Sequence, residues 1–162
     1  MSKKYTLTGN KIIIPGYTLY RIRALISFDN VTVGESGGYI ESENNLSHDG
    51  DCWVSGDAYV CGNAKVFGNA KVIGDARIFD NAKVYGMARV FRRSHVYGNA
   101  QVYGKSWITD NAHVCGDAHI AGLVNIEVDR NNKIDHGIWI WDIKLDGKYY
   151  LISSTLEKVL ME

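Results

Sequence analysis

The chain has 162 residues, with 18 basic and 18 acidic side chains, so its formal net charge is zero. This length fits one domain with caps at its ends, and the balanced charge argues against a bulk nucleic-acid binder, which usually carries a larger basic excess. No apolar run opens the chain and none is long enough to span a membrane, so we expect neither a secretory signal nor a membrane anchor. The three cysteines are an odd number, and we expect reduced thiols and a cytoplasmic setting.

Residues 1–53 are predicted to form an N-terminal β cap and an irregular first coil. Two strand-like segments flank Gly9-Asn10, a pair that favours a two-residue hairpin turn. The glycine-rich segment 34–38 predicts a further sharp turn. A six-residue spacing that dominates the rest of the chain begins here, at Ile40, Leu46 and Cys52.

Residues 54–126 repeat with a period of six. An aliphatic residue occupies every sixth position, a small residue follows four positions later, and a turn pair such as Gly62-Asn63 lies between them. Because side chains alternate along a strand, the aliphatic residue points into a core and its neighbours point outward. Glycine, asparagine and aspartate tolerate the backbone angles of tight corners. A strict period of six predicts a parallel β-helix. The aliphatic positions are Val54, Val60, Val66, Val72, Ile78, Val84, Val90, Val96, Val102, Ile108, Val114, Ile120 and Ile126.

The repeated pattern Val-x-Gly-Asn-Ala-Lys resembles the hexapeptide motif of left-handed β-helix proteins. This resemblance implies a left-handed coil of three hexads, so that residues eighteen positions apart stack in ladders. Residues 19–25, 34–47 and 53–54 are also similar to the head of uncharacterised hexapeptide-repeat proteins of phages, prophages and bacteria. With the repeats, the resemblance covers most of the chain. It implies a phage or prophage origin and a bacterial cytoplasm, and it carries no settled activity.

Residues 127–162 follow the repeat and are predicted to cap its C-terminal end. Two apolar segments flank Asp146-Gly147 and predict a hairpin. Ser154 and Glu157 form a capping box, which predicts a short helix. Caps are needed because an open β-helix end exposes unpaired backbone and core. The predicted fold is all-β: a left-handed parallel β-helix of hexapeptide repeats with an N-terminal β cap and a C-terminal β-hairpin plus short helix.

Outward positions eighteen residues apart are expected to form columns on three faces. One column consists of Phe67, Tyr85 and Tyr103, a contiguous apolar stripe of the kind that marks an oligomer or partner surface. We therefore predict self-association through these residues into a homo-oligomer, a dimer or a trimer. The alternative is that stacked rings only reinforce neighbouring strands, at roughly 0.2–1 kcal/mol per pair.

The corner at residues 91–94, Phe-Arg-Arg-Ser, departs from the repeat because both of its turn positions are long and charged. If Arg92 adopts the angles that glycine usually supplies, the strain is on the order of 1 kcal/mol. A local rule broken without visible gain indicates a functional site; the alternative is an irregular corner that tolerates solvated arginines. Arg89 is expected to lie against Trp107 in a cation–π contact. The predicted partner-binding residues are Arg92, Arg93, Arg89, Lys71, Phe91, Trp107, Arg77 and His95.

Two enzyme-like alternatives rest on the histidines. Many left-handed β-helix proteins are trimeric acyltransferases with a catalytic histidine and an inserted loop, but the unbroken hexads leave no such loop here. In addition, no histidine has a carboxylate at a useful spacing. His95 and His113 are expected to stack on adjacent coils, whereas His119 points to a different face, which disfavours a metal site. The sequence predicts no catalytic residue, no metal site and no cofactor.

The predicted function is therefore binding rather than catalysis. By resemblance, the protein is expected to be a phage- or prophage-encoded effector that binds and blocks a host macromolecule, for instance a nucleic-acid-dependent defence complex such as a CRISPR effector. The expected partner is a host protein or a protein–nucleic-acid complex, without a membrane. The alternatives are a structural or assembly component and a degenerate hexapeptide acyltransferase.

Overall fold

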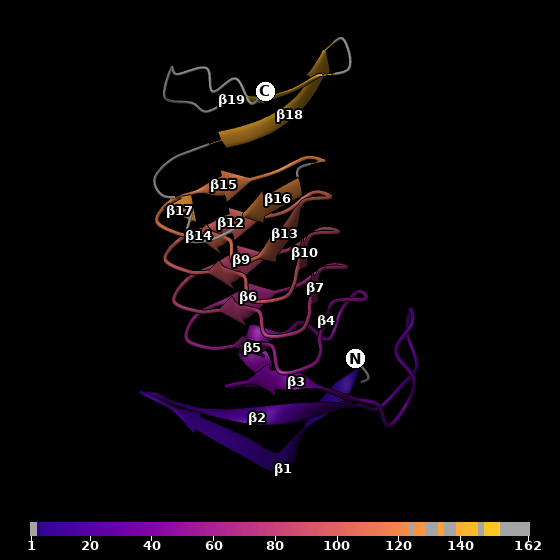
Figure 1. The fold of residues 1–162 in the computed structure, drawn as a ribbon. Helices are drawn as coiled ribbons and strands as arrows, with labels where there is room; N and C mark the ends of the chain where they lie inside the picture. Colours follow the sequence, from indigo (N-terminus) through magenta and orange to yellow (C-terminus); the bar gives the residue numbers. More distant parts are fainter. Residues whose placement is uncertain (1–2, 124, 129–132, 135–138, 146–147, 153–162) are drawn as a thin grey trace.

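The computed structural model describes residues 3–123, 125–128, 133–134, 139–145 and 148–152, and it shows a triangular β-solenoid (Figure 1). Its strands form three sheets, one on each face of the prism. The first sheet contains β1 (Tyr5–Ile14), β2 (Tyr17–Ala24), β3 (Ser36–Ile40), β5 (Tyr59–Val60), β8 (Arg77–Ile78), β11 (His95–Val96), β14 (His113–Val114) and β17 (Lys133–Ile134). The second contains β4 (Trp53–Val54), β7 (Lys71–Val72), β10 (Arg89–Val90), β13 (Trp107–Asp110) and β16 (Asn125–Val128). The third contains β6 (Lys65–Val66), β9 (Lys83–Val84), β12 (Gln101–Val102), β15 (His119–Ile120), β18 (Trp139–Leu145) and β19 (Lys148–Ile152).

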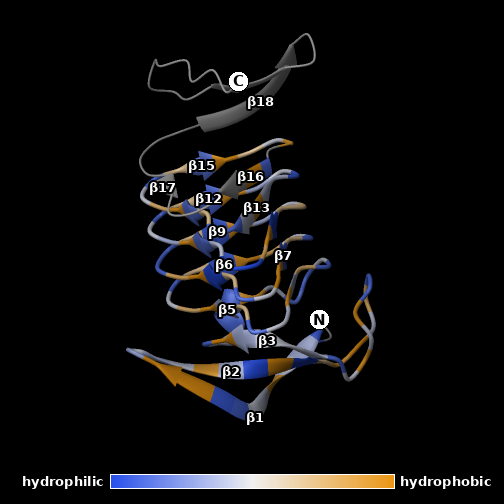
Figure 2. Cartoon of the chain, in the orientation of Figure 1, coloured by the Kyte–Doolittle hydropathy of each residue, from blue (hydrophilic) through white to orange (hydrophobic). Residues whose placement is uncertain are grey.

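Successive coils stack in parallel with a register of 18 residues, as Val54 pairs with Val72 and Val72 with Val90. The aliphatic residue of every hexad from Val54 to Ile120 is at most 1% exposed, and these side chains form one continuous core. The outward residue of each strand is mostly polar, which gives the stacked β6, β9, β12 and β15 their hydrophilic surface (Figure 2). The predicted all-β, left-handed parallel β-helix is confirmed.

The first coil is irregular, as predicted. Tyr39 pairs with Tyr59 and Leu46 bridges to Val66, a spacing of 20 residues instead of 18. The extra length accommodates the 3-10 turn η1 (Glu43–Asn45). A spacing of 20 residues recurs at the other end, where Lys133 pairs with His113 and Trp139 with His119. The coiled stacking therefore continues past Ile126, where the sequence repeat stops.

Two serines take the place of alanine at the small inward position. Ser94 and Ser106 are both completely buried. The Ser94 hydroxyl donates to the carbonyl oxygen of Phe91 at 2.8 Å, and the Ser106 hydroxyl donates to the carbonyl oxygen of Tyr103 at 2.7 Å. Each buried hydroxyl is thus satisfied within its own corner, so the substitution leaves no unpaired polar group in the core.

One edge of the prism is reinforced by a ladder of side-chain amides. The Nδ2 of Asn63 donates to Asn81 at 3.1 Å, Asn81 donates to Asn99 at 3.1 Å, and Asn99 donates to Asp117 at 2.9 Å. Each contact joins residues 18 positions apart, so the ladder follows the same register as the strands. The turn residues that the repeat selects for their backbone angles also connect the coils.

The predicted hairpin turn at Gly9-Asn10 is wrong. These residues lie inside the long strand β1, at a bulge where the register to β2 shifts between Leu7 and Lys11. The chain reverses instead at Pro15-Gly16, where Gly16 has a φ of +85°. A bulge and a turn both favour glycine, so the Gly-Asn pair did not discriminate between them.

The predicted sharp turn over residues 34–38 is only partly correct. The chain turns at Gly34, with a φ of +85°, but Gly37 and Gly38 lie in strand β3. A Cβ added at Gly37 would lie 2.6 Å from the side chain of Ile22, and one at Gly38 would lie 2.5 Å from the Ala58 carbonyl oxygen. These two glycines allow the N-terminal sheet to pack closely on the first coil.

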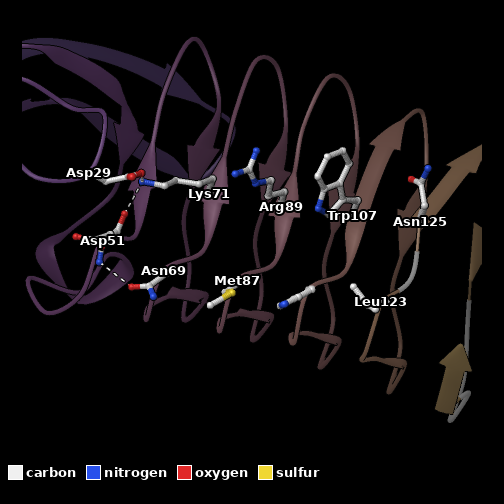
Figure 3. A pocket seen from close by; sticks show the side chains of 10 residues that line it. Asp29, Asp51, Asn69, Lys71, Met87, Arg89, Trp107, Leu123 and Asn125 are labelled. Carbon is white, nitrogen blue, oxygen red and sulfur yellow. Dashed lines mark hydrogen bonds and ion pairs between the residues drawn. The ribbon is translucent and has the colours of Figure 1, made fainter.

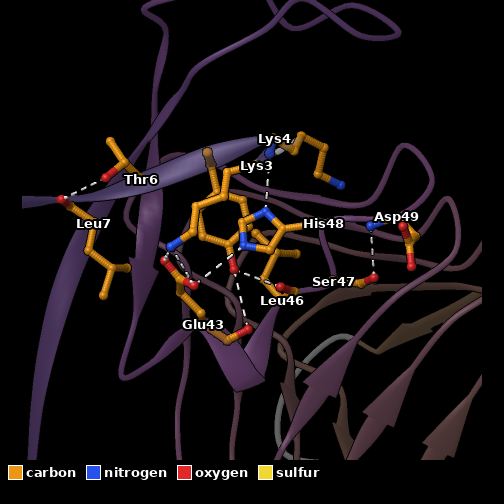
Figure 4. A network of polar contacts seen from close by, with 10 residues as sticks. Lys3, Lys4, Thr6, Leu7, Glu43, Leu46, Ser47, His48 and Asp49 are labelled. Carbon is orange, nitrogen blue, oxygen red and sulfur yellow. Dashed lines mark hydrogen bonds and ion pairs between the residues drawn. The ribbon is translucent and has the colours of Figure 1, made fainter. Parts of the chain in front are cut away.

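Polar contacts anchor the start of β1 to the first coil (Figure 4). The ammonium of Lys4, which is only 2% exposed, donates to the carbonyl oxygens of Gly50 at 3.0 Å and Cys52 at 2.9 Å. The Tyr5 hydroxyl donates to the carbonyl oxygen of Leu46 at 2.6 Å. Burial lowers the pKa of Lys4 and raises the pKa of Tyr5. The N-terminal cap is therefore fixed to the prism by buried hydrogen bonds as well as by sheet pairing.

The predicted C-terminal hairpin is confirmed, because β18 and β19 pair antiparallel with Leu145 opposite Lys148. The short helix predicted from Ser154 lies outside the described residues. Within the described part of the chain, no helix has the length and apolar character that a membrane span requires.

Replacing Gly98 with alanine is expected to destabilise the fold more than replacing Gly16 with alanine. Both glycines have positive φ angles, +68° and +85°, and both variants therefore acquire left-handed strain; that strain is ~1 kcal/mol. Only at Gly98 does the new Cβ meet the next coil, 2.9 Å from the Gly116 nitrogen, whereas nothing lies within 4 Å at Gly16. Urea unfolding measures both losses. Equal losses would show that the spacing between coils does not restrict this corner.

Candidate functional site

The outward side of the second sheet carries a row of basic and aromatic side chains, which we call the basic–aromatic face. Lys71 pairs with Arg89, and Arg89 pairs with Trp107, so the three side chains project from adjacent coils in one column. Asn69, Met87, Lys105 and Leu123 form a parallel column at the neighbouring corner (Figure 3). Between the columns lies an open groove of about 560 Å³.

Lys71 is held in place at the N-terminal end of this groove. Its ammonium forms an ion pair with Asp29 at 2.8 Å and donates to the carbonyl oxygen of Asp51 at 2.6 Å. The hydrogen bond from Lys71 lowers the pKa of the Asp29 carboxyl. Trp53, which continues the column below Lys71, is buried against Phe28 and is only 2% exposed. The exposed part of the face therefore begins at Arg89.

Arg89 and Trp107 form the predicted cation–π contact, with the guanidinium carbon 5.5 Å from the ring centroid. The Trp107 side chain is 44% exposed, which is unusual for a tryptophan in a regular sheet. Among the described residues, no carboxylate forms an ion pair with Arg89 or with the exposed Lys105. This end of the groove therefore combines an accessible indole with two uncompensated positive charges.

The corner at residues 91–94 has the predicted backbone strain, because Arg92 has a φ of +61°. Both arginines are nevertheless paired: Arg92 with Asp110 of the next coil, and the Arg93 Nε with an oxygen of Asp75 at 4.0 Å. The two arginine side chains are 65% and 78% exposed, so these ion pairs add little stability. They do cancel most of the positive charge that the sequence assigned to this corner.

The remaining two predicted partner-binding residues lie on the first sheet, across that corner. Arg77, His95 and His113 stack on adjacent coils. The Arg77 guanidinium lies over the Tyr59 ring at 5.5 Å, and the imidazole centroids of His95 and His113 are 4.5 Å apart. Burial, then His113 and Arg77, lowers the pKa of His95 from its ordinary value of 6.5 to about 4. His95 is therefore neutral at pH 7.

The structure thus divides the eight predicted residues into three groups. Lys71, Arg89 and Trp107 form the basic–aromatic face; Arg77 and His95 lie on the first sheet; Arg92 and Arg93 lie at the corner between them. Phe91 joins the first and third groups, because its ring meets Trp107 edge-on at 6.0 Å. Sequence reasoning missed Asp29 and Asp51, which come from the irregular N-terminal segment and carry no periodic signal.

The predicted aromatic column forms a stacked ladder on the third sheet. Phe67 and Tyr85 stack with centroids 4.7 Å apart, and Tyr85 and Tyr103 stack at 4.9 Å, both nearly parallel. Each ring covers a face of its neighbour, so all three side chains are half-buried rather than fully exposed. A second stacked pair, Phe79 and Tyr97 at 4.9 Å, lies on the first sheet.

Groups that could support catalysis or hold a metal were also sought. The described residues contain no cluster of three or more His, Cys, Asp and Glu side chains that could bind a metal ion. In the same part of the chain, neither His95 nor His113 forms an ion pair with a carboxylate that could orient it as a base. The three cysteines are free and buried, as the sequence predicted.

Comparison with known proteins gives no relative: no family model matches this sequence, and no curated protein matches it.

The depressed pKa of His95 predicts a loss of stability in mild acid. The unfolded chain takes up a proton near pH 6.5, whereas the folded chain does so only near pH 4. The contribution is therefore complete above pH 6.5 and is lost as pH falls from 6.5 to 4. Urea unfolding of wild type and His95→Gln at pH 7 and pH 4.5 should show a smaller loss in the variant. A matched His119→Gln variant should retain the wild-type loss; if His95→Gln does too, His95 is not the source.

Proposed function

We propose that the protein is a non-enzymatic binding protein, and that its partner docks on the exposed end of the basic–aromatic face. The observation that supports this most strongly is the combination at Arg89, Lys105 and Trp107: two unpaired positive charges beside a tryptophan that is 44% exposed. Tryptophan and arginine are enriched among the residues that dominate binding energy at protein interfaces.

The rigidity of the face favours binding further. Arg89 projects from a two-residue strand that pairs on both sides, and its guanidinium is oriented by the indole of Trp107. Long side chains that are already ordered lose less conformational entropy on binding, so the same contacts give a higher affinity. A solenoid face of this kind presents a preformed surface rather than one that folds on contact.

The charge pattern indicates the kind of partner. Asp29 and Asp51 make the end near Lys71 unfavourable for an anion, whereas Arg89 and Lys105 favour one. A partner with a local acidic patch beside an apolar residue fits this pattern. A host protein or a protein–nucleic-acid complex can supply such a patch, and the chain's zero net charge favours a protein surface over bulk nucleic acid.

The wider setting is also part of this proposal. The resemblance to hexapeptide-repeat proteins of phages and prophages supports a phage-encoded protein that blocks a host macromolecule in the bacterial cytoplasm, such as a CRISPR effector. The absence of a carboxylate partner for His95 and His113 among the described residues agrees with binding rather than acyl transfer.

The docking surface can be tested with two double variants of equal charge change. Once a partner has been captured from host lysate and purified, Arg89→Gln/Lys105→Gln should weaken its binding by about 1–3 kcal/mol, the scale of hydrogen bonds to charged groups. Arg92→Gln/Arg93→Gln should weaken it less, because these arginines are already paired with Asp110 and Asp75. Isothermal titration calorimetry measures both affinities. An unchanged affinity in the first variant would contradict the proposed surface.

We also propose self-association through the ladder of Phe67, Tyr85 and Tyr103. Light scattering at tens of micromolar should give a mass above that of the monomer, and Tyr85→Lys should return it to the monomer. Tyr97→Lys is the matched control, because it interrupts a ring stack of similar geometry on another face. A monomer mass for the wild type would refute self-association, and dissociation by both variants would place the contact elsewhere.

A further inference from the structure

A second concave region lies between the first sheet and the N-terminal hairpin, and we call it the Arg77 cleft. It consists of two cavities, of about 500 and 340 Å³, which share Ile14, Tyr59 and Arg77 as lining residues. The remaining surface of this sheet is built from short stacked strands, so the concavity arises where the β1–β2 hairpin adds a second wall. Cavities of this size are typical of small-molecule sites.

Arg77 is the unbalanced charge in this cleft. Asp57 and Asp75 also line the larger cavity, but Asp57 pairs with Arg21 at 3.0 Å and Asp75 with Arg93 at 4.0 Å. No carboxylate in the described part of the chain forms an ion pair with Arg77. Its guanidinium rests over the Tyr59 ring at 5.5 Å, which orders it without neutralising it.

The imidazoles of His95 and His113 line the same cavity as Arg77. Their contact at 4.5 Å, together with burial, keeps His95 neutral, with a pKa of about 4. A neutral imidazole has one N–H donor and one acceptor nitrogen. The cavity can therefore offer an oxyanion the fork of Arg77 and further N–H donors from the histidines, a set that suits the oxygens of a phosphate group.

The smaller cavity supplies a different kind of wall. Ile14, Pro15, Tyr17 and Phe79 line it, and Arg77 connects it to the cavity that holds the histidines. The Phe79 ring is fixed by stacking on Tyr97 at 4.9 Å. Aromatic and aliphatic walls of this kind accept a planar apolar group, while a few polar side chains fix its orientation.

We propose that the Arg77 cleft binds a small aromatic phosphate monoester, with its phosphate on Arg77 and the two histidines and its ring against the wall formed by Pro15, Tyr17 and Phe79. This site is separate from the basic–aromatic face and does not depend on the docking of a macromolecule there. It uses two residues, Arg77 and His95, that the sequence singled out but that lie across a corner from Arg89.

Isothermal titration calorimetry with three probes at pH 7.5 tests the site on the purified full chain. Phenyl phosphate should bind saturably at millimolar concentrations, and more tightly than inorganic phosphate or phenol, because only it engages both cavities. Arg77→Gln should weaken phenyl phosphate at least about tenfold, the loss expected for hydrogen bonds to a charged group. Arg93→Gln, which removes an arginine already paired with Asp75, should leave the affinity unchanged.

A further variant separates binding from folding. Arg77→Lys keeps the charge and the methylene stem but loses the planar fork, and it should also weaken phenyl phosphate while circular dichroism stays that of the wild type. The proposal is overturned if phenyl phosphate shows no saturable binding, if it binds no more tightly than inorganic phosphate, or if Arg77→Gln and Arg93→Gln behave alike.

Discussion

Backbone hydrogen bonds between residues 18 positions apart hold the prism together, as between Ser55 and Val72 or Ile73 and Val90, each at 2.9 Å. This register leaves each short strand paired above and below, which is why strands of only two residues are stable. It also requires the corner glycines, since a Cβ at Gly98 would strike the next coil. The core, the corners and the faces all follow from this one repeat of hydrogen bonds.

The same register places like residues on like residues, with opposite consequences for different side chains. Aromatic rings gain from it, as in the ladder of Phe67, Tyr85 and Tyr103. Charged residues lose from it, as where Lys65 lies beside Lys83, unless the next coil supplies the opposite charge. Arg92 and Asp110 show this second solution, and Arg89 with Trp107 shows a third, in which a cation lies on a ring. The surface is therefore a set of columns whose energies depend on vertical neighbours.

Much of this could be predicted from the sequence, because the period of six determines the inward residues and the step of eighteen determines the columns. The ion pairs of the arginine corner followed from the same arithmetic: Asp110 lies 18 residues after Arg92, and Asp75 lies 18 before Arg93. That signal was present but was not applied to charge. Asp29 could not be placed in this way, because it comes from an aperiodic loop that folds back to Lys71. The Arg77 cleft likewise depends on where the N-terminal hairpin lies, and the mistaken turn at Gly9-Asn10 hid it.

The central claim is that a partner docks on the unpaired charges beside Trp107 rather than on the paired arginines of the corner. Site-specific photo-crosslinking tests this most directly, with a photoreactive residue placed in turn at Lys105 on the basic–aromatic face, Arg93 at the corner and Lys83 on the third sheet. After irradiation with the partner, the account predicts a strong covalent adduct from position 105, a weak one from position 93 and none from position 83. An adduct that forms from position 83 or 93 but not from position 105 would contradict it.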